Sequence, residues 1–234
     1  MSIRDNIAAL QEKIAQAARR SGRSPSEVAL MTVTKTHPPD RIRKAYESGL
    51  RLFGENRVQE FSTKAGTLAD LAGAEWHMIG HLQTNKAAKA AELFSAVDSV
   101  DSVKLAERLD AGARALNKQL QVLIEVNVGG EAAKTGVGPD LPELEDFLKA
   151  APRLKALNFR GLMTVPPFTE DPEGARPYFR RLRALRDQIA ARNFPAITLE
   201  ILSMGMSHDF TVAIEEGSTC IRIGTAIFGE REKP

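Results

Sequence analysis

Short apolar runs alternate with longer helix-like segments along almost the whole chain, and this alternation constrains the fold more than any other feature. The first run, residues 28–34 (VALMTVT), is apolar and β-branched, as is typical of a buried strand. Seven more strand candidates follow, at residues 51–53, 75–79, 96–100, 120–128, 156–164, 198–202 and 219–223. Strands separated by helices indicate a parallel sheet. Eight such units, with apolar strands that lack clean alternation, favour a closed barrel over an open doubly wound sheet.

The expected architecture is a single parallel TIM-type (β/α)8 barrel with an extra N-terminal helix. The chain has 234 residues, close to the ~250 that are typical of such barrels, and no Pro/Gly/Ser-rich linker divides it. We therefore expect one domain over residues 1–234. The extra helix should end near Ser21 and Gly22. Its apolar face is predicted from Ile3, Ile7, Leu10 and Ile14.

Two later segments carry helix signals. Asp171 and Pro172 predict an N-cap and a first-turn proline for a long arginine-rich helix that ends near residue 193. The arginines of that helix form a stripe, which is either a solvated outer face or a docking patch; they include Arg176, Arg180 and Arg183. An earlier helical face is predicted from Leu105, Leu109, Ala113 and Leu116.

Charge and cysteine content argue against several classes of function. Lys plus Arg (32) nearly balance Asp plus Glu (30), so the net charge of +2 does not support a nucleic-acid or membrane partner. The one cysteine, Cys220, cannot form an internal disulfide. No signal peptide is visible and no run approaches ~18 apolar residues, so we expect a cytoplasmic protein. The four histidines show no metal-ligand spacing and predict no metal site; they are His37, His77, His81 and His208.

Polar residues at the ends of the predicted strands are candidates for the site, because barrels of this kind carry their active sites at the carboxyl ends of the strands. Lys35 ends the first strand and is a candidate Schiff-base residue, since partial burial disfavours its ammonium form and exposes a nucleophilic amine. The alternative is a lysine that reaches into solvent. His81 follows the third strand and could bond near a ligand, whereas His77 lies within that strand and is expected to be structural.

Two small-residue loops lie where such barrels often bind phosphate, after the seventh and eighth strands. The first loop contains Ser203, Met204 and Gly205, and the second contains Gly224 and Thr225. Their backbone N–H groups and hydroxyls could converge on a dianion. The alternative is a pair of ordinary strand-to-helix turns, which are also rich in glycine and serine.

Five segments of the chain resemble the pyridoxal phosphate homeostasis protein family. They are residues 33–36 (VTKT), 53–60 (FGENRVQE), 76–86 (WHMIGHLQTNK), 202–207 (LSMGMS) and 221–229 (IRIGTAIFG). The resemblance implies a fold like the N-terminal barrel of alanine racemase and pyridoxal 5'-phosphate bound as a Schiff base on Lys35. It also implies that Asn56 lies beside the cofactor and that Arg222 faces the pyridine nitrogen. Ser203, Gly224 and Thr225 are implied to hold the phosphate.

Arg222 also needs a partner on physical grounds, because it lies between two isoleucines in a predicted strand and an unpaired buried charge is costly. A carboxylate such as Glu200 or Glu125 could supply an ion pair, and this interpretation does not exclude the pyridine nitrogen. Lys134, in the loop after the fifth strand, could contact a ligand or lie at the surface.

The function remains open between a non-catalytic pyridoxal phosphate carrier and an amino-acid racemase that uses the same cofactor. A racemase needs a second base, which in alanine racemase is a tyrosine from a further domain. Tyr46 and Tyr178 both lie in predicted helices, and eleven residues after the last strand leave no room for such a domain. We therefore expect a monomeric carrier, with pyridoxal-phosphate-dependent apo-enzymes as candidate recipients. A lysine-dependent aldolase without a cofactor leaves the two phosphate loops less well explained.

Overall fold

Eight parallel strands form a closed barrel in which each strand pairs with its neighbours in chain order and β8 pairs with β1. The computed structural model describes residues 2–131, 135–192, 194 and 196–229. The strands are β1 (Ala29–Val33), β2 (Leu52–Glu55), β3 (Glu75–Met78), β4 (Ala96–Val100), β5 (Leu120–Glu125), β6 (Leu157–Met163), β7 (Ile197–Ser203) and β8 (Cys220–Ile223). This confirms the predicted TIM-type barrel.

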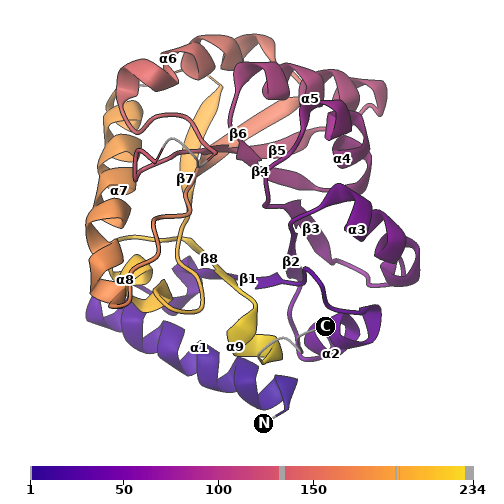
Figure 1. The fold of residues 1–234 in the computed structure, drawn as a ribbon, viewed down its shortest axis with the longest axis vertical. Coiled ribbons are helices and arrows are strands. Elements are labelled where there is room, and N and C mark those ends of the chain that lie inside the picture. Colours follow the sequence, from indigo (N-terminus) through magenta and orange to yellow (C-terminus); the bar gives the residue numbers. More distant parts are fainter. Residues whose placement is uncertain (1, 132–134, 193, 195, 230–234) are drawn as a thin grey trace.

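The helices surround the strands on the outside of the barrel (Figure 1). They are α1 (Ile3–Arg20), α2 (Pro39–Glu47), α3 (Val58–Lys64), α4 (Ala87–Leu93), α5 (Val103–Ala115), α6 (Leu141–Ala150), α7 (Arg176–Ala191), α8 (Phe210–Glu215) and α9 (Thr225–Phe228). Short 3-10 helices lie at Pro25–Glu27, Ala65–Leu68, Thr84–Lys86, Ala151–Arg153 and Pro172–Ala175. None of the helices within the described residues is both long and apolar enough to cross a membrane.

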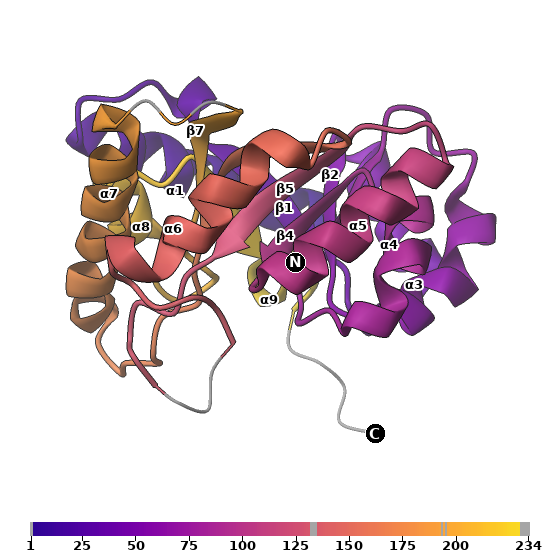
Figure 2. The ribbon, with the colours of Figure 1, turned by 90° about the horizontal axis from the view of Figure 1, so that it is seen from above.

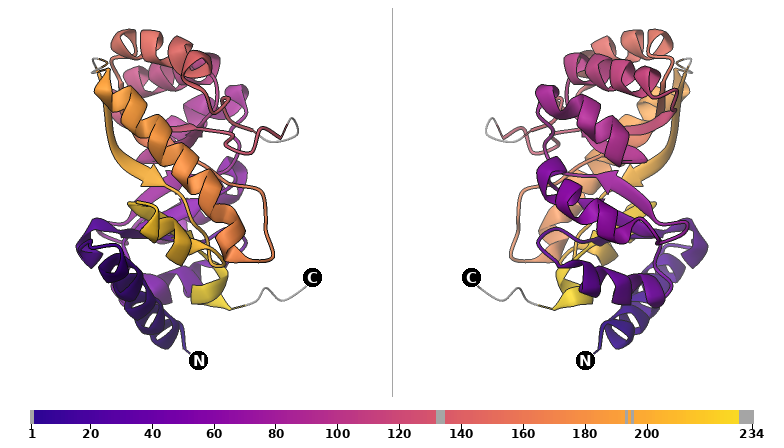
Figure 3. Two further views of the ribbon diagram at one scale, coloured as in Figure 1. Left: turned by 90° about the vertical axis from the view of Figure 1, so that its left-hand side faces the viewer. Right: turned by 90° about the vertical axis from the view of Figure 1, so that its right-hand side faces the viewer.

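The extra N-terminal helix α1 packs along the outside of the barrel against α8 and α9 (Figures 1 and 3). Ser2 and Asp5 form a capping box that satisfies N–H groups at its start. Its buried face includes three of the four residues that the spacing predicted, Ile7, Leu10 and Ile14. The helix ends at Arg20, as expected.

Three details differ from the sequence-based expectations. The run at 120–128 ends as a strand at Glu125, and the chain then makes one isolated parallel bridge between Val126 and Val137. Leu116 is the C-cap of α5 and is 48% exposed, because the helix stops before its face is complete. Asp171 caps the 3-10 helix Pro172–Ala175, and α7 begins only after it.

The arginine stripe of α7 forms ion pairs with the adjacent α8. Arg176 bonds the carboxylates of Glu215 and Glu216, each at 2.8 Å, and Arg180 reaches Glu216 at 3.1 Å. Hydrogen bonds and ion pairs from these arginines hold the pKa of Glu216 below its usual value, although its burial acts in the opposite direction. The stripe therefore joins two neighbouring helices.

Glycine is required at position 161, where β6 changes register against both of its neighbours. A Cβ atom at Gly161 would lie 1.9 Å from the carbonyl oxygen of Ile201 on β7. Such a contact is impossible without separating β6 from β7, and backbone atoms of paired strands cannot move aside as a flexible side chain can.

We therefore expect Gly161→Ala to lower the free energy of unfolding by about 2 kcal/mol or more, as overpacked core sites do. Gly66→Ala is the matched control, since a Cβ atom at Gly66 meets no atom within 4 Å. Urea unfolding followed by circular dichroism measures both variants. Equal stability of the two would contradict this account of Gly161.

Candidate functional site

A cavity of about 350 Å³ lies at the carboxyl ends of the strands, within the ~300–1,000 Å³ range of small-molecule sites. The described parts of the loops after β5 and β6 extend together from one side of the barrel (Figure 2). Most of the residues that line the cavity come from strand ends or the loops after them. They are Val33, Lys35, His37, Asn56, Ile79, Val165, Met206, Ser207, His208, Arg222, Gly224, Thr225 and Gly229.

Lys35 is half-buried and reaches the cavity two residues after β1 ends. The residue before it, Thr34, is fully buried. The residue after it, Thr36, has a φ of +67°, a conformation that is uncommon for a β-branched residue. The chain therefore turns sharply at Lys35, and this turn directs the segment away from the strand direction.

Arg222 lines the cavity although only 4% of its surface is exposed. Its Nη1 donates to the backbone oxygen and to Oγ of Ser203, both at 2.7 Å, and its Nη2 donates to the backbone oxygen of Thr164 at 2.7 Å. Neither of the two candidate carboxylates pairs with Arg222. Glu200 bonds Arg160 instead, and Glu125 accepts from the hydroxyl of Thr135.

The guanidinium of Arg222 still has donor capacity for a ligand. Burial lowers its pKa, while the negative charges of Asp98, Asp209 and Glu125 act in the opposite direction. Arginine nevertheless remains protonated at any ordinary pH. Within the described residues its Nε–H has no hydrogen-bond acceptor. A buried cation with a remaining donor, lining a cavity, fits a ligand that offers an acceptor atom at this depth.

Backbone donors are available on two sides of the same cavity. The N–H groups of Ser207 and His208, after β7, donate to no acceptor in the described part of the chain. The same holds for the N–H groups of Thr225 and Ala226, after β8. Unsatisfied N–H groups together with the hydroxyls of Ser207 and Thr225 make a donor set that suits a phosphate group.

The structure brings five of the eight sequence-predicted site residues to the cavity: Lys35, Asn56, Arg222, Gly224 and Thr225. The other three do not line it. Ser203 is fully buried and its hydroxyl accepts from Arg222, while Met204 is also fully buried. Gly205 has a φ of +97°, and a Cβ atom there would lie 2.6 Å from Cβ of Ala213. From this loop, Met206 and Ser207 line the cavity instead.

The apolar part of the lining was missed by sequence reasoning. Val33, Ile79 and Val165 line the cavity, and each lies at or within two residues of a strand end. Their positions at strand ends could therefore have identified them as lining residues, although apolar residue types alone could not. His37 also lines the cavity, with its ring 4.2 Å from the ring of Phe228.

The two histidines of the third unit lie outside this cavity. His81 lines a neighbouring hollow of about 410 Å³ that shares Asn56 with the cavity, and it pairs with Asp101 at 3.2 Å. His77 is buried against Asp98; burial lowers its pKa, but the carboxylate outweighs burial and holds the pKa above its usual value. His77 thus has the structural position that was expected. Lys134 lies outside the described residues.

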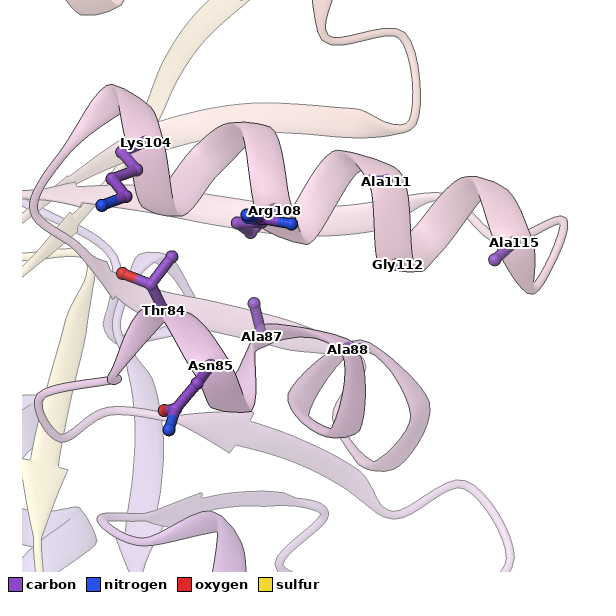
Figure 4. Close-up of a pocket in the computed structure, with 9 residues that line it drawn as sticks. All are labelled: Thr84, Asn85, Ala87, Ala88, Lys104, Arg108, Ala111, Gly112 and Ala115. Carbon is purple, nitrogen blue, oxygen red and sulfur yellow. The ribbon is translucent and has the colours of Figure 1, made fainter.

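A larger hollow of about 640 Å³ lies elsewhere, on the outside of the barrel between α4 and α5 (Figure 4). Its floor is alanine and glycine, and Gly112 lets the two helices approach closely, since a Cβ atom there would lie 3.1 Å from Cα of Ala88. Lys104 and Arg108 on α5 face the short helix that carries Thr84. No residue from the carboxyl end of a strand lines it, so it is separate from the cavity at Lys35.

Cys220, the only cysteine, is buried at the start of β8. Burial raises the pKa of its thiol to about 12. Among the described residues there is no group of three or more His, Cys, Asp or Glu side chains that could hold a metal ion.

Comparison with known proteins agrees with this arrangement. The model of the family "Alanine racemase, N-terminal domain" matches residues 6–232. A pyridoxal phosphate homeostasis protein of Aquifex aeolicus is 47% identical over 233 residues, covering 99% of this chain and 100% of the relative. One from Pseudomonas aeruginosa is 44% identical, covering 99% and 96%.

Solved structures give the same result. PipY of Synechococcus elongatus, with pyridoxal phosphate bound, is 38% identical with a TM-score of 0.84, covering 97% of this chain and 100% of PipY. Alanine racemase from Streptomyces coelicolor is 19% identical with a TM-score of 0.72, covering 98% of this chain and 58% of the racemase, and this likeness concerns the fold alone. By full-length identity, the chain belongs to the pyridoxal phosphate homeostasis protein family, whose barrel is that of the alanine racemase N-terminal domain.

Proposed function

We propose that this protein holds pyridoxal 5'-phosphate as a Schiff base on Lys35 and serves vitamin B6 homeostasis and cofactor supply rather than catalysis. The observation that carries the proposal is the convergence of three different groups on one cavity. These are the amine of Lys35, the buried guanidinium of Arg222 and the backbone donors at Ser207 and Thr225. The cofactor offers a matching aldehyde, ring nitrogen and phosphate. PipY, a relative with this fold, binds the same cofactor.

The covalent link uses only groups that the proposal names. The nitrogen of Lys35 adds to the aldehyde carbon, the aldehyde oxygen leaves as water, and a C=N bond forms. Addition of water reverses the reaction, so the link can be made and broken without an oxidant or a reductant. A reversible link suits a protein that stores and releases a cofactor.

Arg222 favours storage over carbanion chemistry. Arginine is always protonated and can only donate, so a ring nitrogen that faces it must accept. The pyridine ring then stays neutral, and a neutral ring stabilises a carbanion less than a protonated ring does. The buried position of Arg222, fixed by Ser203 and Thr164, makes this electrostatic environment rigid.

The racemase alternative lacks a tyrosine base among the residues that line the cavity. The hydroxyl of Tyr46 donates to the backbone oxygen of Ala72, and Tyr178 lies on the outer helix α7. Neither lines the cavity. We also propose that the protein acts as a monomer and passes its cofactor to apo-enzymes. A closed barrel supports the monomer, because it leaves no strand edge for association with a second copy.

The first test locates the covalent link. Borohydride reduction of the protein incubated with pyridoxal phosphate, followed by peptide mass mapping, should place the pyridoxyl group on Lys35. Lys86, which lines the neighbouring hollow, is one alternative position for the label. A label found mainly on Lys86 or Lys134, with Lys35 unmodified, would contradict the assignment.

The second test concerns the phosphate. Pyridoxal should bind on the order of 100-fold more weakly than pyridoxal phosphate, because two or more hydrogen bonds to a charged group, each ~1.5–3 kcal/mol, are lost. Thr225→Val should weaken phosphate-form binding about tenfold for the same reason, and Thr225→Ser, which keeps the hydroxyl, should restore most of it. Titration followed by absorbance measures the affinity of the wild type for both vitamers and of the two Thr225 variants for pyridoxal phosphate. Equal affinity for the two vitamers would refute this site.

The third test concerns catalysis. The protein loaded with pyridoxal phosphate should interconvert alanine enantiomers far more slowly than the ~1–1,000 turnovers per second of typical enzymes. Chiral chromatography over time measures the rate. Rapid interconversion that disappears in Lys35→Met would establish the racemase instead.

A further inference from the structure

A buried lysine on α3 lies beside the ends of β1 and β2, although sequence reasoning did not single it out. Lys64 is the last residue of α3 and is 8% exposed. Its Nζ lies 3.0 Å from Oε1 of Glu55, which ends β2 and is fully buried. The same Nζ lies 2.6 Å from Oε1 of Glu60 and donates to the backbone oxygen of Thr34 at 3.3 Å. The ammonium group of Lys64 thus links α3 to the end of β2 and to the residue after β1.

The same carboxylates also bond the two residues that flank Lys35. The hydroxyl of Thr34 donates to Oε1 of Glu55 at 2.7 Å. The backbone N–H of Thr36 donates to Oε1 of Glu60 at 2.6 Å. Thr36 is the residue with the positive φ, so Glu60 stabilises the turn that the chain makes immediately after Lys35. The segment on each side of Lys35 is therefore tied to Lys64 through one carboxylate.

Stability alone does not account for this cluster. Buried ion pairs often contribute less to stability than apolar residues of similar size would. Here the second oxygen of Glu55, Oε2, is buried without a hydrogen-bond partner. Burial disfavours the charged form of Glu55 and raises its pKa, although the Thr34 hydroxyl and the Lys64 ammonium act in the opposite direction. What the cluster does provide is a fixed geometry around Lys35.

We propose that Lys64 is a positioning residue: it holds Thr34 and Thr36 so that Lys35 enters the cavity in one orientation. The inference rests on the proposed Schiff base at Lys35. Misplacing a reacting group by about an ångström can reduce its reactivity by up to ~100-fold, so an anchored segment matters for a nucleophile. Lys64 does not line the cavity, so it can act on Lys35 only through the bonds that hold Thr34 and Thr36.

The test compares two ligands in Lys64→Met, which keeps the length of the side chain and removes its charge. Pyridoxal phosphate can form the Schiff base, whereas pyridoxine 5'-phosphate has no aldehyde and binds only non-covalently. We expect the equilibrium constant for Schiff-base formation, from visible absorbance, to fall about tenfold or more. The affinity for pyridoxine 5'-phosphate, from calorimetry, should change less than about twofold, because the phosphate donors are unaffected.

Lys118→Met is the matched control. Lys118 is half-buried, and its Nζ donates to the backbone oxygens of Ala91 and Phe94, which lie before β4 and not in the segment around Lys35. Its replacement removes an ammonium group and two backbone hydrogen bonds without touching the Lys35 segment. Lys118→Met should therefore leave both equilibrium constants unchanged. If Lys64→Met and Lys118→Met behave alike, Lys64 is merely structural and the inference is overturned.

Glu60 keeps the inference testable if Lys64→Met does not fold. Glu60 is partly exposed, and Glu60→Ala removes the acceptor of the Thr36 N–H, whereas Glu60→Gln keeps an acceptor oxygen. We expect Glu60→Ala to reduce Schiff-base formation and Glu60→Gln to restore most of it. Equal behaviour of the two refutes the inference. If wild type itself gives no reducible adduct at Lys35, the proposed function fails, which is a separate result.

Discussion

The pairing of β1 with β8 is the interaction on which the rest of the structure depends. A parallel strand leaves unpaired polar groups on any free edge, and only closure of the ring satisfies both edges at once. The register aligns Met31 with Arg222 and Thr32 with Ile223. The ends of these two strands therefore lie side by side, which brings Lys35 near the backbone donors at Thr225 and Ala226. Without closure, residues almost 190 positions apart in the chain would not share a cavity.

Two buried cations bind backbone oxygens at the carboxyl ends of the strands. Arg222 binds backbone oxygens where β6 and β7 end, and Lys64 does the same where β1 ends. A carbonyl oxygen can accept two hydrogen bonds, and the cation adds a second donor, as at the oxygen of Ser203, which also accepts from the backbone N–H of Thr164. A cation with several N–H groups bonds more than one such oxygen and links neighbouring strands. In this way the rim that carries the cavity is made rigid by charge as well as by packing.

All eight strands could be predicted from the sequence, because buried parallel strands form compact apolar runs. Lys35 and Arg222 could also be placed, since a charged residue at or in such a run is conspicuous. The partners of Arg222 could not, because backbone oxygens carry no sequence signal and the obvious carboxylates pointed elsewhere. Lys64 was missed for a related reason. A lysine on a short helix is usually exposed, and its contact with Glu55 is evident only in the folded structure. Whether the side chain of Ser203 faces the cavity could not be predicted. Successive side chains of a strand point to opposite faces, so an error of one residue in the strand boundary reverses the expected direction.

The burial of Cys220 has a consequence for how the protein responds to its surroundings. Only the thiolate reacts readily with peroxides or disulfides, and a thiol with a pKa near 12 is almost entirely protonated at neutral pH. Its position at the start of β8 also denies access to large reagents. We therefore expect the one sulfhydryl of the chain to react slowly with peroxides and disulfides at neutral pH.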